Sequence, residues 1–306
     1  MIKKNRFFIF WMLAISLCVW SCDKSEANIS EEPPIVVPDE KEDEKEDEKD
    51  DTVFAGTTWE TKALSDAVEW KYFHFSNLFS SRQFISVLDI DLSDGKVKID
   101  IPYVKSGFLK TSEGAINSRA TAAVNGSFFD TSVGGSTVFL KKEDVIINTT
   151  RTGFTPYREN AGFGVNKAGD VFIIQRPSTG WQSAEAYSLL VSGPLLVYDG
   201  TLVPQINQAF NTNRHPRTAI GVTADNHIIA VVVDGRFSES NGMTTKEMSI
   251  VMKDLGCVSA MNLDGGGSST MWIKNRGVVN HPSDNKKFDQ LGERGVATVI
   301  SFIENF

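Results

Sequence analysis

Cysteine and histidine are scarce in this 306-residue chain, and their scarcity excludes several classes of site. The four histidines are far apart in the sequence and lack the spacing of metal ligands. They are His74, His215, His227 and His281. Of the three cysteines, Cys18 falls in a predicted export signal and Cys22 is expected to be acylated. Cys257 would then remain alone, which excludes an intramolecular disulfide. We interpret Cys257 as a small buried hydrophobic residue rather than a nucleophile.

Positive charge is also in short supply, which argues against nucleic acid as a partner. The formal net charge is −8, and residues 39–51, with ten acids and three lysines, contribute −7 of it. Residues 52–306 are therefore nearly neutral, whereas a chain that binds nucleic acid usually carries a basic face. The 41% of hydrophobic residues is typical of an ordinary globular protein.

Residues 1–21 predict a bacterial lipoprotein signal peptide. A basic start at Lys3-Lys4 precedes an apolar run over residues 7–20, and Cys22 follows directly after a small residue. We expect cleavage before Cys22 and lipidation of its thiol. The mature protein would then be anchored to a membrane of the bacterial cell envelope, such as the outer membrane, facing the periplasm or the cell surface. The alternative is a plain secretory signal with an incidental cysteine.

Residues 22–52 predict a disordered acidic tether. Its prolines are followed by lysine-and-acid repeats with a period of four residues. A segment so charged and so poor in apolar groups cannot bury enough surface to fold. We expect it to hold the domain over residues 53–306 away from the membrane.

Strand patterns dominate residues 53–306, and no domain boundary interrupts them. A hairpin is predicted from Phe84–Leu92 and Lys96–Ile101, which flank Ser93-Asp94-Gly95. Further strands are predicted at Thr121–Asn125, Gly162–Asn166, Val171–Gln175, Leu195–Gly200, Thr218–Thr223, Ile228–Asp234, Val258–Leu263 and Val296–Ile303. Many strands with few helices indicate an α+β fold, a single domain with a mixed or antiparallel sheet.

One helix is clearly indicated between Thr244 and Gly256. Thr244 and Glu247 have the spacing of a capping box, and the apolar residues after them recur at helical intervals. Gly256 is typical of the residue that follows a helix. Shorter helices are predicted near residues 64–68 and 183–187.

The segment Asn262-Leu263-Asp264 followed by three glycines is the strongest candidate for an active site. Three consecutive glycines are costly to order, so they indicate a loop where backbone approaches a ligand. Successive amides in such a loop can form an anion-binding concavity. Asp264 at a strand end could then act on the substrate. The loop residues predicted to bind substrate are Gly265, Gly266, Gly267, Ser268 and Ser269.

A second candidate lies on the predicted hairpin over residues 217–236. Arg217 opens one strand and Asp234 closes the other, so the two are expected at about the same level, with Arg236 beside them. Arginine binds phosphate in a bidentate manner, and cleavage of a glycosidic bond usually needs two carboxylates. The alternative is a cross-strand Arg217–Asp234 ion pair on a solvated face. His215 is interpreted as a loop residue.

Two further strand ends carry small polar residues. Asn125, before Gly126, is predicted to orient a sugar hydroxyl or a phosphate oxygen, and Ser192-Gly193 is predicted to form another substrate-binding edge.

Together these motifs resemble the phosphodiester glycosidase family over residues 84–303. The motifs are Asn125-Gly126 with Phe128-Phe129, Arg217-Thr218-Ala219, Asp234-Gly235-Arg236, and Asn262 to Ser269. The resemblance implies hydrolysis of a sugar 1-phosphodiester, such as an N-acetylglucosamine-α-1-phosphodiester, to free sugar and a phosphate monoester. It also implies that Asn125, Arg217, Asp234 and Asp264 are catalytic. Ser127 departs from a glycine common in the family, which affects the pocket wall.

The sequence leaves the division of work between Asp234 and Asp264 open. No cofactor is required by the sequence, although a divalent cation, Ca²⁺ or Mg²⁺, is compatible with the acids. Two alternatives remain: a non-catalytic surface module that binds phosphorylated glycans, and a phosphodiesterase that cleaves the P–O bond.

Overall fold

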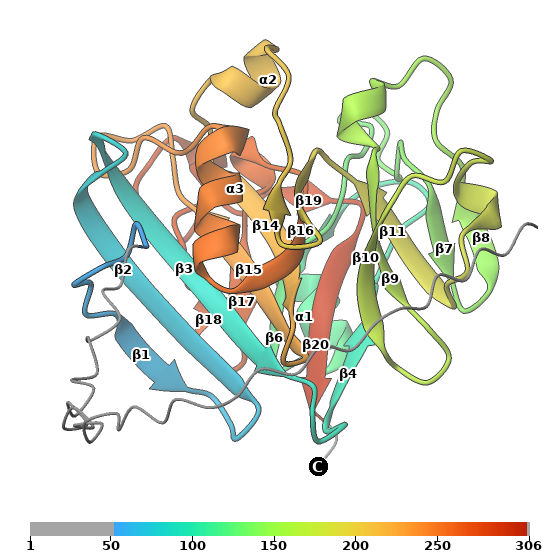
Figure 1. Cartoon of the computed structure of the whole chain (residues 1–306), viewed down its shortest axis with the longest axis horizontal. Coiled ribbons are helices and arrows are strands. Elements are labelled where there is room, and N and C mark those ends of the chain that lie inside the picture. Colours follow the sequence, from blue (N-terminus) through green and yellow to red (C-terminus); the bar gives the residue numbers. More distant parts are fainter. Residues whose placement is uncertain (1–51, 305–306) are drawn as a thin grey trace, which may run out of the picture. The chain divides into compact units, whose positions relative to one another are not determined.

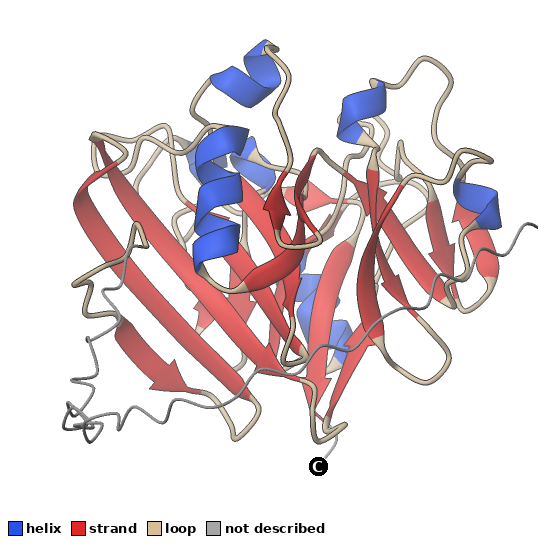
Figure 2. Ribbon diagram, in the orientation of Figure 1, coloured by secondary structure: helices blue, strands red, loops and turns tan. Residues whose placement is uncertain are grey.

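Antiparallel β-sheets make up most of the computed structural model, which describes residues 52–304. An eight-stranded sheet lies beside two five-stranded sheets, and every strand pairing is antiparallel (Figures 1 and 2). The predicted α+β fold of strands with few helices is thus confirmed. The predicted lipoprotein signal, the lipidation site Cys22 and the acidic tether up to Asp51 lie outside the described residues.

The large sheet contains eight strands. In spatial order they are β1 (Glu60–Ala63), β2 (Val68–Leu78), β3 (Ser81–Asp91), β15 (His227–Val233), β14 (Arg217–Thr223), β16 (Cys257–Asn262), β12 (Leu195–Tyr198) and β13 (Thr201–Leu202).

The smaller sheets complete the fold. One contains β10 (Val171–Gln175), β9 (Ala161–Val165), β11 (Ser188–Ser192), β7 (Leu140–Lys142) and β8 (Val145–Asn148). The next contains β18 (Gly277–Val278), β17 (Met271–Ile273), β6 (Ala122–Asn125), β20 (Val299–Glu304) and β4 (Val97–Asp100). A two-stranded sheet contains β19 (Gly295–Val296) and β5 (Leu109–Lys110).

The central strand β15 is buried on both faces, which explains its continuous apolar run. Ile228 and Val232 pack into the core shared with the five-stranded sheets. Ile229 and Val231 point to the opposite face and pack into a second core. Successive side chains of a strand point to opposite faces, so a strand covered on both sides cannot alternate apolar with polar residues.

Helix α3 (Thr245–Asp254) covers the second face of the large sheet (Figure 1). Its predicted capping box is present: the Thr244 hydroxyl accepts a hydrogen bond from Glu247 N, and Glu247 accepts one from Thr244 N. Gly256 has φ +88°, a conformation that glycine adopts without strain. The prediction of this helix is confirmed.

Other local predictions were wrong. β3 and β4 do not form a hairpin, because β3 pairs with β2 and β15 whereas β4 pairs with β20 in another sheet. Residues 64–67 form bends rather than a helix, and the helix near residues 183–187 is replaced by the 3-10 turn η2 (Trp181–Ser183). Tertiary pairing overrides the local turn and helix patterns at these positions.

The remaining short elements complete the chain. They are α1 (Thr111–Ser118), α2 (Ala209–Thr212), and the 3-10 turns η1 (Pro156–Arg158), η3 (Gly266–Ser268) and η4 (Ser283–Asn285).

One end of the large sheet gathers the predicted site residues. Arg217 pairs with Val233, and Ala219 pairs with Asn262. Continuing this register places Asp234 beyond the end of β15 and Asp264 beyond the end of β16, on either side of the start of β14. The prediction that Arg217 and Asp234 lie at about the same level is confirmed.

Candidate active site

Asp264 borders a cavity of about 700 Å³ at this end of the sheet. The cavity is also lined by two arginines, Arg158 and Arg294, and by the rings of Phe128 and Phe154. Its outer wall is polar. That wall contains Asp130, Thr131, Ser132, Thr137, Arg151, Thr152 and Thr155.

The Asp264 carboxyl group is held in a desolvated position that disfavours its charge. Burial raises its pKa above the ordinary value of an aspartate, although four neighbours act in the opposite direction. These are the Ser268 hydroxyl, the Gly265 amide that donates to Oδ1 at 2.9 Å, and the guanidinium groups of Arg158 and Arg294. A carboxyl group with a raised pKa beside cationic groups is suited to proton transfer.

Arg158 is the basic residue that the sequence did not reveal. Its guanidinium carbon lies 4.2 Å from the ring centroid of Phe128 and 4.4 Å from that of Phe210. Within residues 52–304 the guanidinium forms neither a hydrogen bond nor an ion pair, and its Nε is buried without a partner. Burial lowers the pKa of Arg158, while Asp264 acts to raise it. The two rings thus hold a cation whose donors are free for an anionic ligand.

Two more arginines lie against the glycine loop. A Cβ atom on Gly266 would lie 2.8 Å from Arg236 Nη2, and one on Gly267 would lie 2.5 Å from Arg294 Nη2. Arg236 also donates to Ser283 Oγ at 3.3 Å, and Arg294 donates to Asp284. Glycine is favoured in this loop for backbone reasons, because Gly266 has φ +65° and a Cβ on Gly265 would lie 2.7 Å from Pro216 O.

The predicted anion-binding cradle of loop amides is largely occupied by internal hydrogen bonds, and of these amides that of Gly267 alone has no partner in the described residues. The amide of Gly265 donates to Asp264, and that of Gly266 donates to Pro216 O. The amides of Ser268 and Ser269 donate within the loop itself. These four donors are already used, and the cationic groups that line the cavity are arginine side chains.

Arg217 is buried in the frame of the site, with 1% of its surface exposed. Its Nε donates to Met243 O at 2.9 Å, and its Nη2 donates to the carbonyl oxygens of Phe210 and Asn213. Burial, with Arg158 and Arg236 nearby, lowers its pKa to about 10. The prediction that Arg217 binds phosphate in a bidentate manner is wrong, because two nitrogens of its guanidinium group already bind carbonyl oxygens.

Asp234 is also turned inward. Its side chain is completely buried and accepts hydrogen bonds from Asn280 Nδ2 at 2.9 Å and from His281 Nδ1 at 2.6 Å. It does not pair with Arg217, so the alternative of a solvated ion pair between them is excluded. A substrate cannot touch this carboxylate directly, which corrects its prediction as the second catalytic acid.

Asn125 holds neighbouring segments together and does not line the cavity. It is fully buried, and its Nδ2 donates to Asp264 O at 2.8 Å. Its Oδ1 accepts from Thr218 Oγ1 and Thr270 N. All polar groups of Asn125 are used, so the prediction that it contacts substrate is wrong. It instead fixes the backbone of Asp264.

The Ser192-Gly193 edge likewise belongs to the interior. Ser192 is fully buried, and a Cβ on Gly193 would lie 2.9 Å from Tyr157 O. The predicted substrate contact of this edge is corrected, because Gly193 packs against the segment that carries Arg158.

His215 lies near the cationic part of the site. It is half-buried, and burial lowers the pKa of its imidazole, as do the nearby Arg217 and Arg236. Cys257 is a buried free thiol, and burial raises its pKa. The interpretation of Cys257 as a small buried hydrophobic residue is confirmed.

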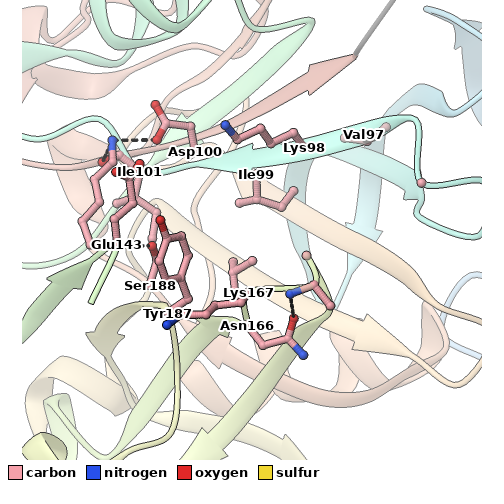
Figure 3. A pocket seen from close by; sticks show the side chains of 15 residues that line it. Val97, Lys98, Ile99, Asp100, Ile101, Glu143, Asn166, Lys167, Tyr187 and Ser188 are labelled. Carbon is pink, nitrogen blue, oxygen red and sulfur yellow. Dashed lines mark hydrogen bonds and ion pairs between the residues drawn. The ribbon is translucent and has the colours of Figure 1, made fainter. Parts of the chain in front are cut away.

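A second cavity, of about 430 Å³, lies at the turn that joins β9 to β10, over residues 166–169 (Figure 3). Tyr187, Lys167 and Asp100 are among the residues that line it (Figure 3). Of its lining residues, Lys142 binds Asp100 at 2.6 Å, and Lys167 binds Asp144, a residue outside the lining, at 2.8 Å. Paired charges of this kind are typical of a surface crevice.

Neither a metal cluster nor a membrane helix is found in residues 52–304. No group of three or more histidine, cysteine or acidic side chains in this part of the chain is arranged to hold a metal ion. Among the helices of the same residues, none is long and apolar enough to cross a membrane.

Comparison with known proteins gives consistent results. N-acetylglucosamine-1-phosphodiester α-N-acetylglucosaminidase is 26% identical over 210 residues in Mus musculus and 28% identical over 212 residues in Bos taurus. Each match covers 61% of this chain and 38% of the relative. An uncharacterized SPbeta prophage-derived protein of Bacillus subtilis, YomE, is 39% identical over 71 residues, which cover 23% of this chain and 11% of that protein. The chain thus spans well under half the length of these relatives.

Solved structures share the fold. The catalytic domain of the zebrafish N-acetylglucosamine-1-phosphodiester α-N-acetylglucosaminidase, auto-inhibited by its pro-peptide, matches with a TM-score of 0.62 at 20% identity, covering 84% of this chain and 92% of that one. A hypothetical protein from Synechocystis matches with a TM-score of 0.59 at 15% identity, covering 81% of this chain and 64% of that one. The family model for phosphodiester glycosidases matches residues 118–303. The chain therefore belongs to the phosphodiester glycosidase family.

Proposed function

We propose that this protein hydrolyses sugar 1-phosphodiesters of the N-acetylglucosamine-α-1-phosphodiester type, giving free sugar and a phosphate monoester. Membership of the family and the names of its relatives support this reaction class. The observation that carries the proposal is the Arg158 guanidinium, stacked between two rings and without a protein partner in the described residues, beside Asp264 in one cavity.

The phosphodiester binds between Arg158 and Arg294 in this proposal. Both line the cavity, and both lie close enough to Asp264 to influence its pKa. Positive groups fixed before the reaction stabilise the charge that develops on the leaving phosphate, and losing one such group costs about 3–4 kcal/mol of barrier.

Asp264 serves as the proton donor. Because burial raises its pKa, a larger fraction of this carboxyl group is protonated near neutral pH than of an exposed aspartate. As the bond between the anomeric carbon and the phosphate oxygen breaks, its electron pair passes to that oxygen, which takes the proton. The water oxygen then bonds to the anomeric carbon and loses one proton to solvent, and Asp264 takes a proton back from solvent.

Hydrolysis in ¹⁸O-labelled water tests both the reaction and the bond that is cleaved. With methyl N-acetyl-α-glucosaminyl phosphate as substrate, we expect turnover with the label in the sugar. Label in the phosphate would show a phosphodiesterase that cleaves P–O, and binding without turnover would show a glycan-binding module; either result overturns the proposal.

The Asp264→Asn variant tests the residue assignment. It should reduce kcat by at least about 1,000-fold, since the proton donor is lost. Asp130→Asn, on the exposed wall of the same cavity, is the matched control and should keep near-normal turnover. Near-normal turnover in Asp264→Asn would contradict the role of Asp264.

The location of the protein is a separate proposal. We infer lipidation at Cys22 from the export signal, which implies a membrane anchor in the bacterial cell envelope. Cys22→Ser should abolish incorporation of labelled palmitate and release the protein from the membrane fraction. Unchanged labelling would exclude Cys22 as the lipidation site.

The proposed reaction uses no cofactor and no divalent cation. Activity should therefore persist in EDTA, and restoration of lost activity by Ca²⁺ or Mg²⁺ would instead show a metal requirement.

A further inference from the structure

Phe210 is the residue through which an exposed segment reaches the candidate active site. That segment, over residues 203–213, lies between β13 and β14, and most of its side chains are exposed. Its short helix α2 stands out from the large sheet (Figure 1). The Phe210 ring, by contrast, is half-buried and packs against a core cluster that contains Phe128 and Trp181. One aromatic ring thus ties the projecting segment to the wall of the Asp264 cavity, which Phe128 also lines.

The Phe210 ring contacts two guanidinium groups at once. Its centroid lies 4.4 Å from the guanidinium carbon of Arg158 and 4.8 Å from that of Arg217. Burial lowers the pKa of Arg217, and the positive charge of Arg158 lowers it further. Because the face of an aromatic ring attracts cations, a ring that lies against both groups offsets part of their mutual repulsion.

The two arginines differ in how their nitrogen donors are used. Arg217 Nη2 donates to the carbonyl oxygens of Phe210 and Asn213, so Arg217 fixes the backbone that carries the ring. Arg158 forms neither a hydrogen bond nor an ion pair in the described residues, and its Nε is buried without a partner. The orientation of the Arg158 guanidinium is therefore set by packing against aromatic rings.

Three rings lie near the Arg158 guanidinium, and they differ in how deeply they are buried. Phe128, at 4.2 Å, is only 3% exposed and belongs to the core. Phe154 is farther away, at 5.6 Å. Phe210 combines a close contact with a place on an exposed segment. It is therefore the ring that can be replaced with the smallest disturbance of the core.

We propose that Phe210 is a positioning residue that holds the Arg158 guanidinium in place for the phosphate of the substrate; this role rests on the proposed function. The ring acts through Arg158 and does not touch the reacting atoms. An arginine side chain has many rotamers, and ordering it upon binding opposes association. A guanidinium already held by the ring avoids this cost. Arg217 then contributes to the site indirectly, because it anchors the backbone of Phe210.

A double-mutant cycle tests whether Phe210 acts through Arg158. The full chain is assayed for kcat and KM with methyl N-acetyl-α-glucosaminyl phosphate, and calorimetry measures its affinity for methyl phosphate, the expected product. Phe210→Leu should lower kcat/KM and the affinity for methyl phosphate by about 10- to 30-fold each. In the Arg158→Ala background the same substitution should change both less than twofold, because the side chain through which Phe210 acts is gone.

Two further variants of the same segment are controls. Phe210→Tyr keeps an aromatic ring and should retain at least half of the wild-type kcat/KM. Ile206→Ala removes an apolar side chain that is 48% exposed, and it should change kcat/KM less than twofold. Urea unfolding establishes that each variant is folded, and Phe210→Met, of similar volume, takes the place of Phe210→Leu if the latter does not fold.

The contrary results are distinct from one another. A loss of kcat/KM and affinity that persists in the Arg158→Ala background would show a merely structural role and overturn the proposal. Near-normal values in folded Phe210→Leu, or equal losses in Phe210→Tyr, would also overturn it. A wild type that binds methyl phosphate without turnover contradicts the proposed function alone, since the affinities still decide the role of Phe210. A wild type that neither binds nor turns over contradicts both.

Discussion

The two cavities of this protein contain similar residue types but satisfy their charges differently. In the cavity of Figure 3, Lys142 is paired with Asp100 and Lys167 with Asp144. In the cavity beside Asp264, the Arg158 guanidinium has no protein partner in the described residues, and the carboxyl group is desolvated. The Asp264 cavity therefore contains one cation, Arg158, without a protein partner in the described residues, although its Arg151 and Arg294 are paired with Asp130 and Asp284. This unpaired cation makes it the better candidate of the two for a charged substrate.

Arg158→Ala gives the sharpest contrast between the cavities. It should lower kcat/KM by about 100- to 1,000-fold, because the phosphate loses a fixed cation. The measurement is steady-state hydrolysis of the same diester. Arg151→Ala, which removes an exposed arginine of the same cavity that is paired with Asp130, should change kcat/KM less than threefold. Equal effects of the two variants would contradict the special role of Arg158.

Asn125→Ala should show how much the buried hydrogen bonds behind the Asp264 cavity contribute to stability. Removing its four hydrogen bonds should cost about 2–4 kcal/mol of unfolding free energy, because buried partners are left unsatisfied. Asn166→Ala, in an exposed turn at the other cavity, should cost less than about 1 kcal/mol. Urea unfolding measures both, and similar losses would contradict the contrast.

Asp264→Asn should stabilise the fold at neutral pH. The pKa of Asp264 is raised in the folded state, so its contribution to stability is complete below the unfolded-state pKa and is lost as pH rises through the folded-state value. The asparagine side chain of the variant stays uncharged, so the variant does not lose this stability as pH rises. We expect Tm to rise by about 2–4 °C at pH 7 for each kcal/mol recovered, and the gain to vanish at pH 3. A lower Tm at pH 7 would show that the carboxylate stabilises the fold.

Lys142→Ala should have the smallest effect. Its ion pair with Asp100 is partly exposed, so its loss should cost at most about 1 kcal/mol of stability. Turnover of the diester should be unchanged. A measurable loss of turnover would assign a function to the cavity of Figure 3 and would remove the contrast between the two.

Part of the site could be predicted because its residues stand at strand ends within compact motifs. The register of the β14–β15 hairpin follows from two apolar strands and a short turn, so the shared level of Arg217 and Asp234 was accessible from sequence. Side-chain direction was not accessible. Asn125, Arg217 and Asp234 have the right residue types for a substrate site, yet each turns inward to partners that are distant in the sequence.

Arg158, and the partner of Asp234, show the converse limit. Nothing around Arg158 in the sequence marks it, since Phe128 and Phe210 reach it from other parts of the chain. His281 is 47 residues from Asp234 and carries no motif that joins the two. Similarly, the β3–β4 hairpin failed because each strand found its partners in a different sheet.

The sequence by itself determined the strand-rich fold, the capped helix at Thr245–Asp254 and the glycine loop behind Asp264, because these depend on periodicity and on local backbone preferences. Only the tertiary structure decided which charges are neutralised. Ionic and hydrogen-bonding partners are chosen by proximity in space, and burial sets the cost of leaving a charge unpaired. Proximity in space and burial therefore distinguish the buried, fully bonded residues Asn125, Arg217 and Asp234 from Arg158 and Asp264, which line the cavity.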